Sequence, residues 1–439
     1  MTSYQNKKVA ILGWGIDTRD CVPWLLEQGA KITVFDKKKV AENGEEFSGI
    51  TWELGKEDFG DLTKFETVIR SPGVYRYRKE IIEAEKAGVE ISSKTKLFFD
   101  LCPGQIIGVT GTKGKGTTAT LIYQMLKAGS KEAYLGGNIG EKVFDFLPRL
   151  NKNSWVVLEL SSFQLIDLSK SPHIAVVLMV TSEHQDWHPT VEEYVNAKKN
   201  IVSHQQKDDF SVVNRDYPHC RDIADAATGK VIWVSGGDLK DFASGDIGLR
   251  GEHNRENVAA AATAAKLAGV PEPIIRKVIK TFKGLEHRLE EVAVIDGVTY
   301  FNDSFSTVPE TTIAAIKSFR EPLILIAGGS EKGSDFTHLG KEIIKAKNIR
   351  AVILIGLMAK RITKAVRQAE NEQKKGKSVK IVTGCRNMGE IITTARKLAS
   401  RGDIILLSPA AASFDMFQNY KDRGNQFKKA VLDLNHIYE

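Results

Sequence analysis

The strongest constraint on the fold of this chain is an apolar run, residues 106–109, that enters a glycine-rich loop and continues into a helical pattern over residues 117–127. The loop, residues 111–116, reads Gly-Thr-Lys-Gly-Lys-Gly. Glycines allow backbone N–H groups to point at phosphate oxygens, and the N-terminus of the following helix adds partial positive charge. Lys115 can reach the β- and γ-phosphates of a nucleotide. The strand, loop and helix together predict a parallel-sheet domain that binds a nucleoside triphosphate.

The hydroxyl groups of this loop are displaced from their usual place. A general phosphate loop has serine or threonine directly after the lysine, whereas Gly116 stands there and the hydroxyls come at Thr117 and Thr118. A glycine-rich turn with an incidental lysine is the alternative interpretation, but the complete strand, loop and helix pattern favours a nucleotide site. The loop alone does not separate a kinase, an ATPase or a ligase.

Strand and helix patterns alternate along the whole chain of 439 residues, a length that suits roughly two to four domains. Apolar strands separated by helical segments favour parallel pairing with helices on both sheet faces, which is the α/β class. We expect three α/β domains, over residues 1–96, 97–285 and 286–439. The expected helices include residues 21–28, 117–127 and 257–268, and the expected strands are residues 9–12, 32–35, 67–69, 106–109, 155–160, 174–180, 323–327, 351–355, 380–382 and 404–407.

Composition and charge exclude several classes of protein. Apolar residues make up 42% and charged residues 27% of the chain, as in ordinary soluble globular proteins. No apolar run approaches the ~20 residues of a membrane span, and the N-terminal segment lacks a secretory pattern, so we expect a cytoplasmic protein without membrane contact. The net charge of +7 comes without a clustered basic face, which argues against nucleic acid and fits an anionic substrate such as a nucleotide. The four cysteines lack the spacing of a zinc site or a disulfide framework.

The glycine-rich loop resembles that of the Mur ligase family, which also includes folylpolyglutamate synthase. Further segments resemble motifs of this family, in the family's order and at compatible spacing, and they are most similar to its D-glutamate-adding members. Folylpolyglutamate synthase is a poorer match, because the first domain and the Ser-Ser-Phe-Gln run fit the D-glutamate-adding members better. The matching segments are residues 111–117, 136–140, 158–165, 181–186, 194–201, 251–257, 287–288, 302–304, 408–415 and 419–424.

The resemblance implies both an architecture and a reaction. The architecture is a Rossmann-like UDP-binding domain, a central P-loop ATPase-like parallel-sheet domain and a C-terminal Rossmann-like domain for the amino acid. In the reaction, ATP phosphorylates a substrate carboxylate, and an amine then attacks the acyl phosphate to form an amide bond. The implied substrates are UDP-N-acetylmuramoyl-L-alanine and D-glutamate, which places the chain in peptidoglycan synthesis. We expect a monomer that uses ATP and Mg²⁺.

The expected chemistry depends on a few charged and polar side chains. Lys115 would stabilise the transferring phosphoryl group. The hydroxyl of Thr117 and the carboxylate of Glu159 are oxygen ligands suited to Mg²⁺, and His184 would serve a second metal ion. Lys198 aligns with the lysine that is carbamylated in the family, a modification that would turn a cation into an anion beside Mg²⁺. Without the resemblance, His184 looks like a solvated loop histidine and Lys198 like part of an exposed helix face.

The resemblance also assigns the residues that would bind the two nucleotide-containing substrates. Asn254 and Asn257 would meet the base side of ATP, Arg288 its phosphates and Asp303 its ribose. Asp36, at the end of a predicted strand, would accept hydrogen bonds from uracil or ribose, and a turn-capping role is the alternative. The ATP site comprises Gly111, Thr112, Lys113, Gly114, Lys115, Gly116, Thr117, Thr118, Asn254, Asn257, Arg288 and Asp303, and the UDP-substrate site comprises Trp14, Ile16, Asp36, Ser71, Gly73 and Asn138.

The site for the incoming amino acid departs from the family pattern. Thr307, Lys332, Ser413 and Tyr420 align with family positions that hold D-glutamate, and Lys332 offers a cation to a carboxylate. The family usually reads Asp-Ser-Lys-Ala-Thr-Asn where residues 303–308 read Asp-Ser-Phe-Ser-Thr-Val, so phenylalanine replaces lysine at 305 and valine replaces asparagine at 308. Two alternatives therefore stay open. One is a related Mur-type ligase that adds a different amino acid, and the other is an inactive nucleotide-binding homologue.

Overall fold

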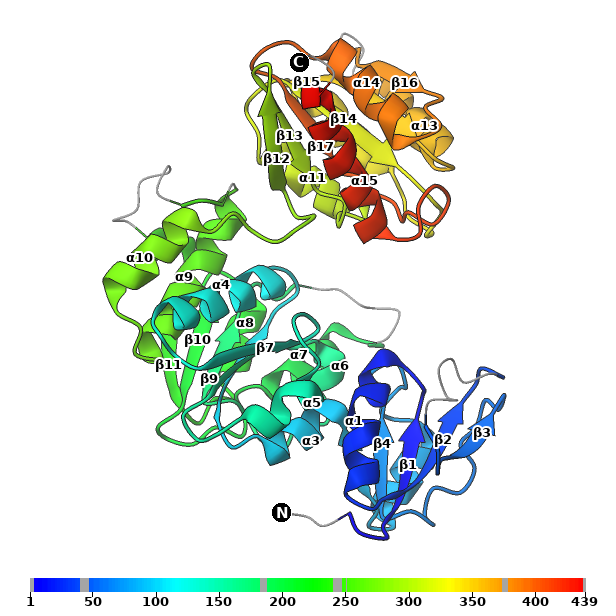
Figure 1. The fold of residues 1–439 in the computed structure, drawn as a ribbon, viewed down its shortest axis with the longest axis vertical. Helices are drawn as coiled ribbons and strands as arrows, with labels where there is room; N and C mark the ends of the chain where they lie inside the picture. The colour runs from blue at the N-terminus through cyan, green and yellow to red at the C-terminus, as the bar shows by residue number, and fades with distance from the viewer. Residues whose placement is uncertain are drawn as a thin grey trace. The chain divides into compact units, whose positions relative to one another are not determined.

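The computed structural model describes residues 4–39, 47–181, 188–239, 247–249, 251–372 and 378–436. The chain forms two compact units, the first made of residues 1–246 with 253–280 and the second of residues 247–252 with 281–439. Two sheets with their helices build the first unit and one sheet builds the second (Figure 1), which confirms the expected three-domain α/β class. The exact domain boundaries stay predictions. In the described ranges, no helix is both long and apolar enough to cross a membrane.

The first sheet is parallel and has the strand order β3-β2-β1-β4-β5. Helix α1 begins at Ile16, earlier than the predicted residue 21, because the Thr18 side chain caps its N-terminus through the backbone of Gly15, which has no capping side chain of its own. The Gly15 N–H donates to Thr18 Oγ1 at 3.1 Å, and the Thr18 hydroxyl donates to the Gly13 carbonyl at 2.6 Å. The elements are β1 (Lys8–Leu12), α1 (Ile16–Glu27), β2 (Lys31–Asp36), β3 (Thr51–Leu54), β4 (Thr67–Arg70), α2 (Lys79–Lys86), β5 (Glu90–Ser93) and α3 (Lys94–Leu101).

The second sheet is also parallel and has the order β11-β10-β9-β6-β8-β7. Its central strands are buried along nearly their whole length, as their near-continuous apolar sequences predicted. The elements are β6 (Gln105–Thr110), α4 (Lys115–Ala128), β7 (Ala133–Gly137), α5 (Val143–Phe146), η2 (Leu147–Arg149), β8 (Trp155–Glu159), α6 (Ser162–Leu165), β9 (Ile174–Val177), α7 (Val191–Lys199), β10 (Phe210–Asn214), α8 (Pro218–Ala224), β11 (Lys230–Val234), η3 (Gly236–Asp238), α9 (Glu252–Leu267) and α10 (Glu272–Thr281).

The third sheet has the order β12-β13-β17-β14-β15-β16 and is parallel except for its edge. Strands β12 and β13 form an antiparallel hairpin, which the parallel strand-helix pattern of the sequence did not predict. The elements are β12 (Glu290–Ile295), β13 (Val298–Asn302), α11 (Pro309–Lys317), β14 (Leu323–Gly328), α12 (Thr337–Lys345), β15 (Ile349–Ile355), α13 (Ala359–Glu372), β16 (Lys380–Thr383), α14 (Met388–Leu398), β17 (Ile404–Leu407), α15 (Tyr420–Leu432) and η4 (Asp433–His436).

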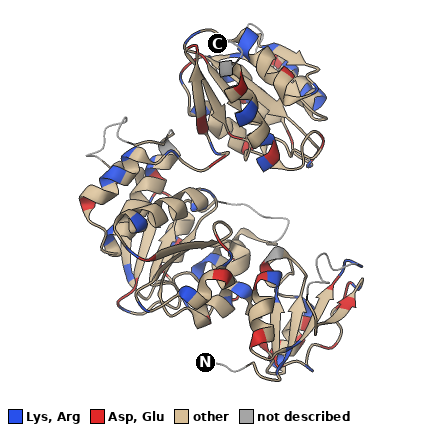
Figure 2. Cartoon of the chain, viewed as in Figure 1, with Lys and Arg blue, Asp and Glu red and all other residues tan. Residues whose placement is uncertain are grey.

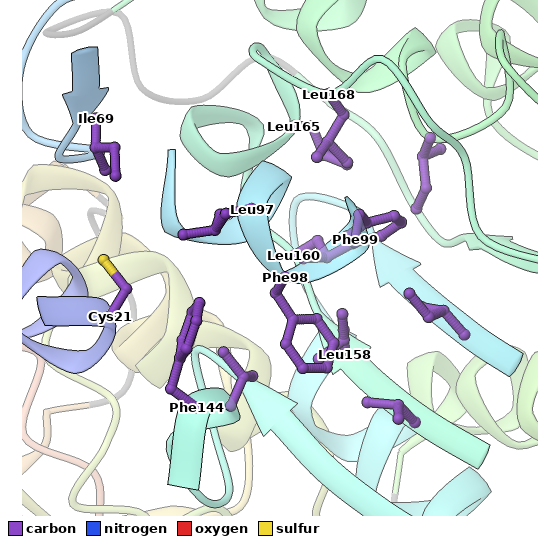
Figure 3. Close-up of a cluster of buried hydrophobic side chains, with 14 of the residues drawn as sticks. Cys21, Ile69, Leu97, Phe98, Phe99, Phe144, Leu158, Leu160, Leu165 and Leu168 are labelled. Atoms are coloured by element: carbon purple, nitrogen blue, oxygen red, sulfur yellow. The ribbon is translucent and has the colours of Figure 1, made fainter. Parts of the chain in front are cut away.

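One buried apolar cluster joins the first two sheets. It includes Cys21 and Ile69 from the first sheet region together with Phe98, Phe144 and Leu158 (Figure 3). The third sheet has separate apolar clusters of its own. Continuous burial of this kind holds the first two sheets together as one unit.

Charged side chains are mixed in sign over the helices of both units (Figure 2). The net charge of +7 is therefore spread along the chain. All four cysteines are free thiols, as the sequence predicted.

Candidate active site

The loop between β6 and α4 has the shape that the sequence predicts for a phosphate site. Strand β6 lies between β8 and β9 in the sheet. Its carboxyl end is therefore at the edge of the sheet where α/β proteins bind ligands. Gly114 has a φ of 86° and directly precedes α4. A Cβ at Gly114 would also collide with the side chain of Asn257, so conformation and space both require glycine. Asn257, assigned to the base side of ATP, therefore lies against the phosphate loop, where its Nδ2 donates to Asn254 Oδ1 at 3.0 Å.

Two threonine hydroxyls stand in the first turn of α4. Both side chains are buried, and within the described ranges Thr118 Oγ1 has no hydrogen-bond partner. A buried hydroxyl without a partner is costly, whereas a phosphate oxygen or a metal ion at the loop would satisfy it. No cluster of three or more His, Cys, Asp or Glu side chains forms a metal site among the described residues. A hydroxyl and a carboxylate beside a polyphosphate are donors that suit Mg²⁺, so Thr117 and Glu159 fit this ion.

The two predicted catalytic lysines meet at the same loop. Lys115 Nζ donates to the carbonyls of Gly111 and Thr112 at 3.1 and 3.0 Å. Lys198 Nζ donates to Thr110 Oγ1 at 3.1 Å and to the Gly111 carbonyl at 3.2 Å. Lys198 is 1% exposed, so the alternative of an exposed helix face is wrong.

Glu159 lies buried at the carboxyl end of β8, next to β6. The Asn138 N–H donates to the Glu159 carbonyl at 3.1 Å, so a predicted UDP-substrate residue lies beside a predicted metal ligand. Gly137 has a φ of 96°, and a Cβ there would run into the backbone of Glu159. The close approach of these two strand ends therefore depends on glycine. His184, the predicted ligand of a second metal ion, lies outside the described residues.

Two residues that the sequence analysis did not assign support the phosphate loop. The hydroxyls of Thr112 and Tyr194 lie 3.0 Å apart, and the Thr112 hydroxyl also donates to the Thr181 carbonyl at 3.1 Å. His188 is 1% exposed, packs edge-on to the Tyr194 ring at 5.4 Å and hydrogen-bonds Ser162 Oγ through Nε2 at 2.9 Å. Tyr194 belonged to a recognised motif, whereas His188 had no pattern that distinguished it from a surface histidine.

The predicted UDP-substrate residues of the first sheet gather at the carboxyl ends of β1, β2 and β4. Asp36 Oδ2 accepts from the Trp14 N–H at 2.6 Å, and Oδ1 accepts from the Lys38 N–H at 2.8 Å. Asp36 therefore does cap a turn, and each oxygen has a second lone pair that a ligand can use. The Trp14 ring is buried against Trp52, with centroids 4.9 Å apart, so the ring packs into the protein rather than facing a ligand.

Three further predicted residues of this site flank the same strand ends, whereas Asn138 follows β7 of the second sheet. Ile16 begins α1, while Ser71 and Gly73 lie in the turn that follows β4. Ser71 is half-buried, and Gly73 and Asn138 are exposed. These positions fit an extended ligand that lies across the carboxyl edge of the first sheet.

In the second unit, Asp303 follows β13 and is buried. Its Oδ2 accepts from the Ser408 hydroxyl at 2.7 Å, and its Oδ1 accepts from the Leu289 N–H at 3.2 Å. Burial raises the pKa of Asp303 to about 6 from an ordinary value of 3.8, although hydrogen bonds from Ser306 and Ser408 act in the opposite direction. The carboxylate form of Asp303 is therefore destabilised in the folded chain.

This pKa shift predicts a pH-dependent stability difference between the wild type and Asp303→Asn. A group whose folded pKa lies above its unfolded pKa stabilises the fold below the unfolded value and loses that contribution as the pH rises through the folded value. The shift corresponds to about 3 kcal/mol. We expect Asp303→Asn to gain stability relative to the wild type between about pH 4 and pH 6 and to keep the gain above it. Calorimetric unfolding of both proteins from acid to neutral pH checks this, and a difference that does not change with pH contradicts it.

Arg288 lies in a strained segment beside the residue that departs from the family pattern. Its neighbours His287 and Leu289 both have left-handed backbone, with φ of 64° and 45°. The guanidinium carbon of Arg288 lies 3.9 Å from the centroid of the Phe305 ring, and the Phe305 and Tyr420 rings meet edge-on at 5.0 Å. Phe305 is 38% exposed. A cation therefore lies beside position 305, where the family usually has lysine.

The predicted amino-acid residues lie at the carboxyl ends of three neighbouring strands, β13, β17 and β14. Thr307 follows β13, the exposed Lys332 follows β14, and the buried Ser413 follows β17. A bridge between Ser330 and Ala412 holds the last two loops side by side. The structure therefore brings Thr307, Lys332, Ser413 and Tyr420 to one edge of the third sheet.

A buried arginine that the sequence analysis did not assign joins these loops. Arg423 is fully buried, and its Nη2 and Nε donate to the Ser304 carbonyl and hydroxyl at 2.9 and 3.0 Å. Its Nη1 donates to the carbonyls of Ala411 and Ala412, both at 3.2 Å. Burial lowers the pKa of Arg423 to about 10. Its motif was recognised, but nothing in the sequence indicated that this side chain would turn inward.

Comparison with known proteins agrees with this arrangement along the chain. Residues 7–93 match the MurD-like N-terminal domain of Mur ligases, residues 109–247 the Mur ligase middle domain and residues 287–411 the glutamate ligase domain of Mur ligases. A UDP-N-acetylmuramoylalanine–D-glutamate ligase of Acetivibrio thermocellus is 42% identical, with 98% of this chain and 97% of the relative covered. One of Symbiobacterium thermophilum with the same name is 38% identical, with 98% of each chain covered.

Solved structures share the fold at low sequence identity. The UDP-N-acetylmuramate-alanine ligase of Thermotoga maritima has a TM-score of 0.57 at 16% identity, covering 98% of this chain and 100% of that one. The MurF ligase of Thermotoga maritima, solved in complex with ADP, has a TM-score of 0.57 at 17% identity, covering 98% and 96%. The chain belongs to the Mur ligase family. Within that family, its full-length relatives named above are the UDP-N-acetylmuramoylalanine–D-glutamate ligases.

Proposed function

We propose that this chain joins D-glutamate to UDP-N-acetylmuramoyl-L-alanine in an ATP-driven step of peptidoglycan synthesis in the cytoplasm. The observation that carries the proposal is the phosphate loop with two lysine amines bound to it, in a chain that is 42% identical to a ligase of this name. The unpartnered hydroxyl of Thr118 at the start of α4 supports a bound polyphosphate. The expected monomeric state remains part of the proposal.

The first chemical step is difficult because a carboxylate must approach a polyphosphate of the same charge. Lys115 would leave the carbonyls of Gly111 and Thr112 and bind the γ-phosphate, where it stabilises the charge of the transferring phosphoryl group. The N-terminus of α4 and the loop N–H groups would hold the other phosphates. Phosphorylation turns a carboxylate oxygen into part of a good leaving group, and the amine of the amino acid then displaces phosphate.

Thr117 and Glu159 would hold Mg²⁺ at this site, with His184 and a carbamylated Lys198 at a second metal position. When bound, Mg²⁺ neutralises phosphate charge and orients the transferring group. The buried position of Lys198 beside Thr110 and Gly111 keeps its amine at the loop. Carbamylation of this amine would supply an anion there. Asn254 and Asn257 would support the nucleotide from α9. The roles of Arg288 at the phosphates and of Asp303 at the ribose stay predictions from the sequence.

The amino acid would bind at the edge of the third sheet that Thr307, Lys332, Ser413 and Tyr420 share. Lys332 would supply a cation for a carboxylate of D-glutamate. A second candidate function, addition of a different amino acid, is favoured by one observation. Phe305 adds an exposed aromatic face to this edge, and an aromatic face also suits an apolar or cationic side chain.

The test is phosphate release from ATP in the presence of UDP-N-acetylmuramoyl-L-alanine and one amino acid at a time, with the mass of the product confirmed. D-Glutamate is compared with L-glutamate, L-lysine, glycine and D-aspartate. We expect turnover with D-glutamate, with phosphate and product formed in equal amounts. Turnover with another amino acid alone would keep the ligase reaction and replace the proposed specificity. A folded protein that binds ATP and turns over none of them would favour the inactive nucleotide-binding homologue.

A further inference from the structure

We infer that Arg70 is a positioning residue for the UDP-linked substrate, which deepens the proposed function and rests on it. Arg70 ends β4, directly before the turn of residues 71–74 that contains two predicted substrate residues. Its side chain is fully buried. It therefore contacts protein rather than ligand, and it acts through the turn.

The guanidinium of Arg70 organises this turn from inside. Its Nη1 donates to the carbonyls of Ser71 at 3.1 Å, Pro72 at 3.5 Å and Val74 at 2.5 Å. The Ser71 N–H donates to the Leu12 carbonyl at 2.8 Å, the Val74 N–H donates to the Ser71 carbonyl at 3.0 Å, and Pro72 has no N–H. Within the described part of the chain, the Gly73 N–H and the Ser71 hydroxyl are therefore the donors of this turn that can serve an anionic or carbonyl-bearing ligand.

The other nitrogens of Arg70 reach the second sheet region. Its Nη2 and Nε donate to Asp167 Oδ2 at 2.6 and 3.1 Å, and Nη2 also donates to the Phe163 carbonyl at 2.9 Å. Asp167 is 1% exposed, so the ion pair is almost completely removed from water. Phe163 and Asp167 belong to the short segment that follows Glu159. One side chain therefore connects the predicted substrate turn to the segment beside the predicted metal ligand.

Two further contacts connect the same stretch of chain to the second sheet region. Arg76 Nε lies 3.0 Å from Asp167 Oδ1, and the Tyr75 hydroxyl donates to Glu193 Oε2 at 3.4 Å. Glu193 Oε1 in turn lies 3.2 Å from His188 Nδ1. Ile69, Leu165 and Leu168, which are close to the pair in sequence, all belong to the shared buried cluster (Figure 3). The turn is held from several sides, and Arg70 is the only one of these residues that bonds both to the turn and to Asp167.

A reaction between two bound substrates depends on their relative position, and a displacement of about 1 Å can cost about 100-fold in rate. We expect Arg70→Lys to raise the KM for UDP-N-acetylmuramoyl-L-alanine about 10- to 100-fold, since one amine cannot replace the six hydrogen bonds of the guanidinium. The KM values for ATP and D-glutamate are expected to change less than about twofold. Asp167→Asn is expected to shift the same KM in the same direction, and the double variant to cost less than the two single changes combined.

Arg78→Gln is the matched control. Arg78 lies on the same stretch of chain but bonds to the Glu57 carbonyl at 2.7 Å and to Glu80 at 3.0 Å, both within the first sheet region. We expect it to leave all three KM values unchanged. All assays are run below the unfolding temperatures of the variants, and ADP binding is measured for each one to show that the second sheet is intact.

The outcomes separate the inference from the proposed function. A selective rise in the KM for the UDP-linked substrate, together with unchanged ADP binding, supports the positioning role. An equal loss for all three substrates, or a lower unfolding temperature with unchanged KM values, overturns it. An Arg78→Gln variant that shifts the same KM as far as Arg70→Lys overturns it as well. A wild-type chain without turnover overturns the proposed function itself, and the inference with it.

Discussion

Replacement of Lys115 by alanine is expected to lower kcat by about 10³-fold or more, which corresponds to about 4 kcal/mol of transition-state stabilisation. Lys115 Nζ lies at the phosphate loop, within 3.1 Å of two of its carbonyls, and it has only to change partners to reach a γ-phosphate. The cation stabilises charge that spreads over the phosphoryl oxygens during transfer, so its loss affects kcat more than the KM for ATP. Steady-state phosphate release and product formation measure both constants.

Lys127→Ala is a suitable control for this experiment. Lys127 lies in the last turn of the same helix, α4, and is exposed. The Lys127→Ala substitution removes one positive charge without changing the loop, and we expect its activity to lie within about twofold of the wild type. A Lys115→Ala protein that keeps more than about a tenth of the wild-type kcat would contradict the assigned role.

Replacement of Lys198 by alanine is expected to lower kcat by about 10²- to 10³-fold. This amine is buried at the phosphate loop, where it hydrogen-bonds Thr110 and Gly111 and lies 4.7 Å from the Tyr194 ring centroid. If the lysine works as a carbamate, wild-type protein grown with isotopically labelled bicarbonate gives a carbamate carbon resonance that Lys198→Ala lacks. Kinetics and this spectrum are measured on the same preparations.

Lys199→Ala is the matched control, because Lys199 is the next residue on α7 and is half-buried. We expect it to keep both the carbamate resonance and activity near the wild-type level. A wild-type protein with full activity and no carbamate signal would contradict the modification while leaving the kinetic prediction for Lys198→Ala in place. Equal losses in the two variants would contradict a specific role for Lys198.

The parts of the fold that the sequence predicted well are those with strong local signals. Buried parallel strands such as β6, β8 and β14 are continuous apolar runs, and their bounds agree with prediction to within a residue or two. The start of α1 was placed too late, because the Gly15 and Thr18 cap replaces the usual capping side chains. The β12–β13 hairpin was missed because β12 is partly exposed and neither strand is apolar along its whole length.

The residues of the candidate site also differ in how well the sequence predicted them. The phosphate loop, Lys115 and Glu159 lie in or beside a patterned strand, so local sequence indicated their chemistry. Arg70 and Arg423 could not be found like this, because their roles depend on carbonyl groups that tertiary packing brings to them. A buried arginine looks like any surface arginine in a sequence, and only the fold reveals which carbonyls surround it.

The resting position of Lys115 has a consequence for nucleotide recognition. The Lys115 amine already donates hydrogen bonds to two carbonyls of the loop. When ATP binds, hydrogen bonds to phosphate oxygens replace these bonds, so no new hydrogen bonds are added. The net gain in affinity from this lysine is then small, whereas its contribution grows as the phosphoryl group begins to move and becomes a better acceptor than an amide carbonyl. ADP lacks the γ-phosphate, so the Lys115 amine has no such acceptor to replace the loop carbonyls. The amine of Lys115 would thus stay on the loop carbonyls when ADP is bound and lie on the γ-phosphate when ATP is bound.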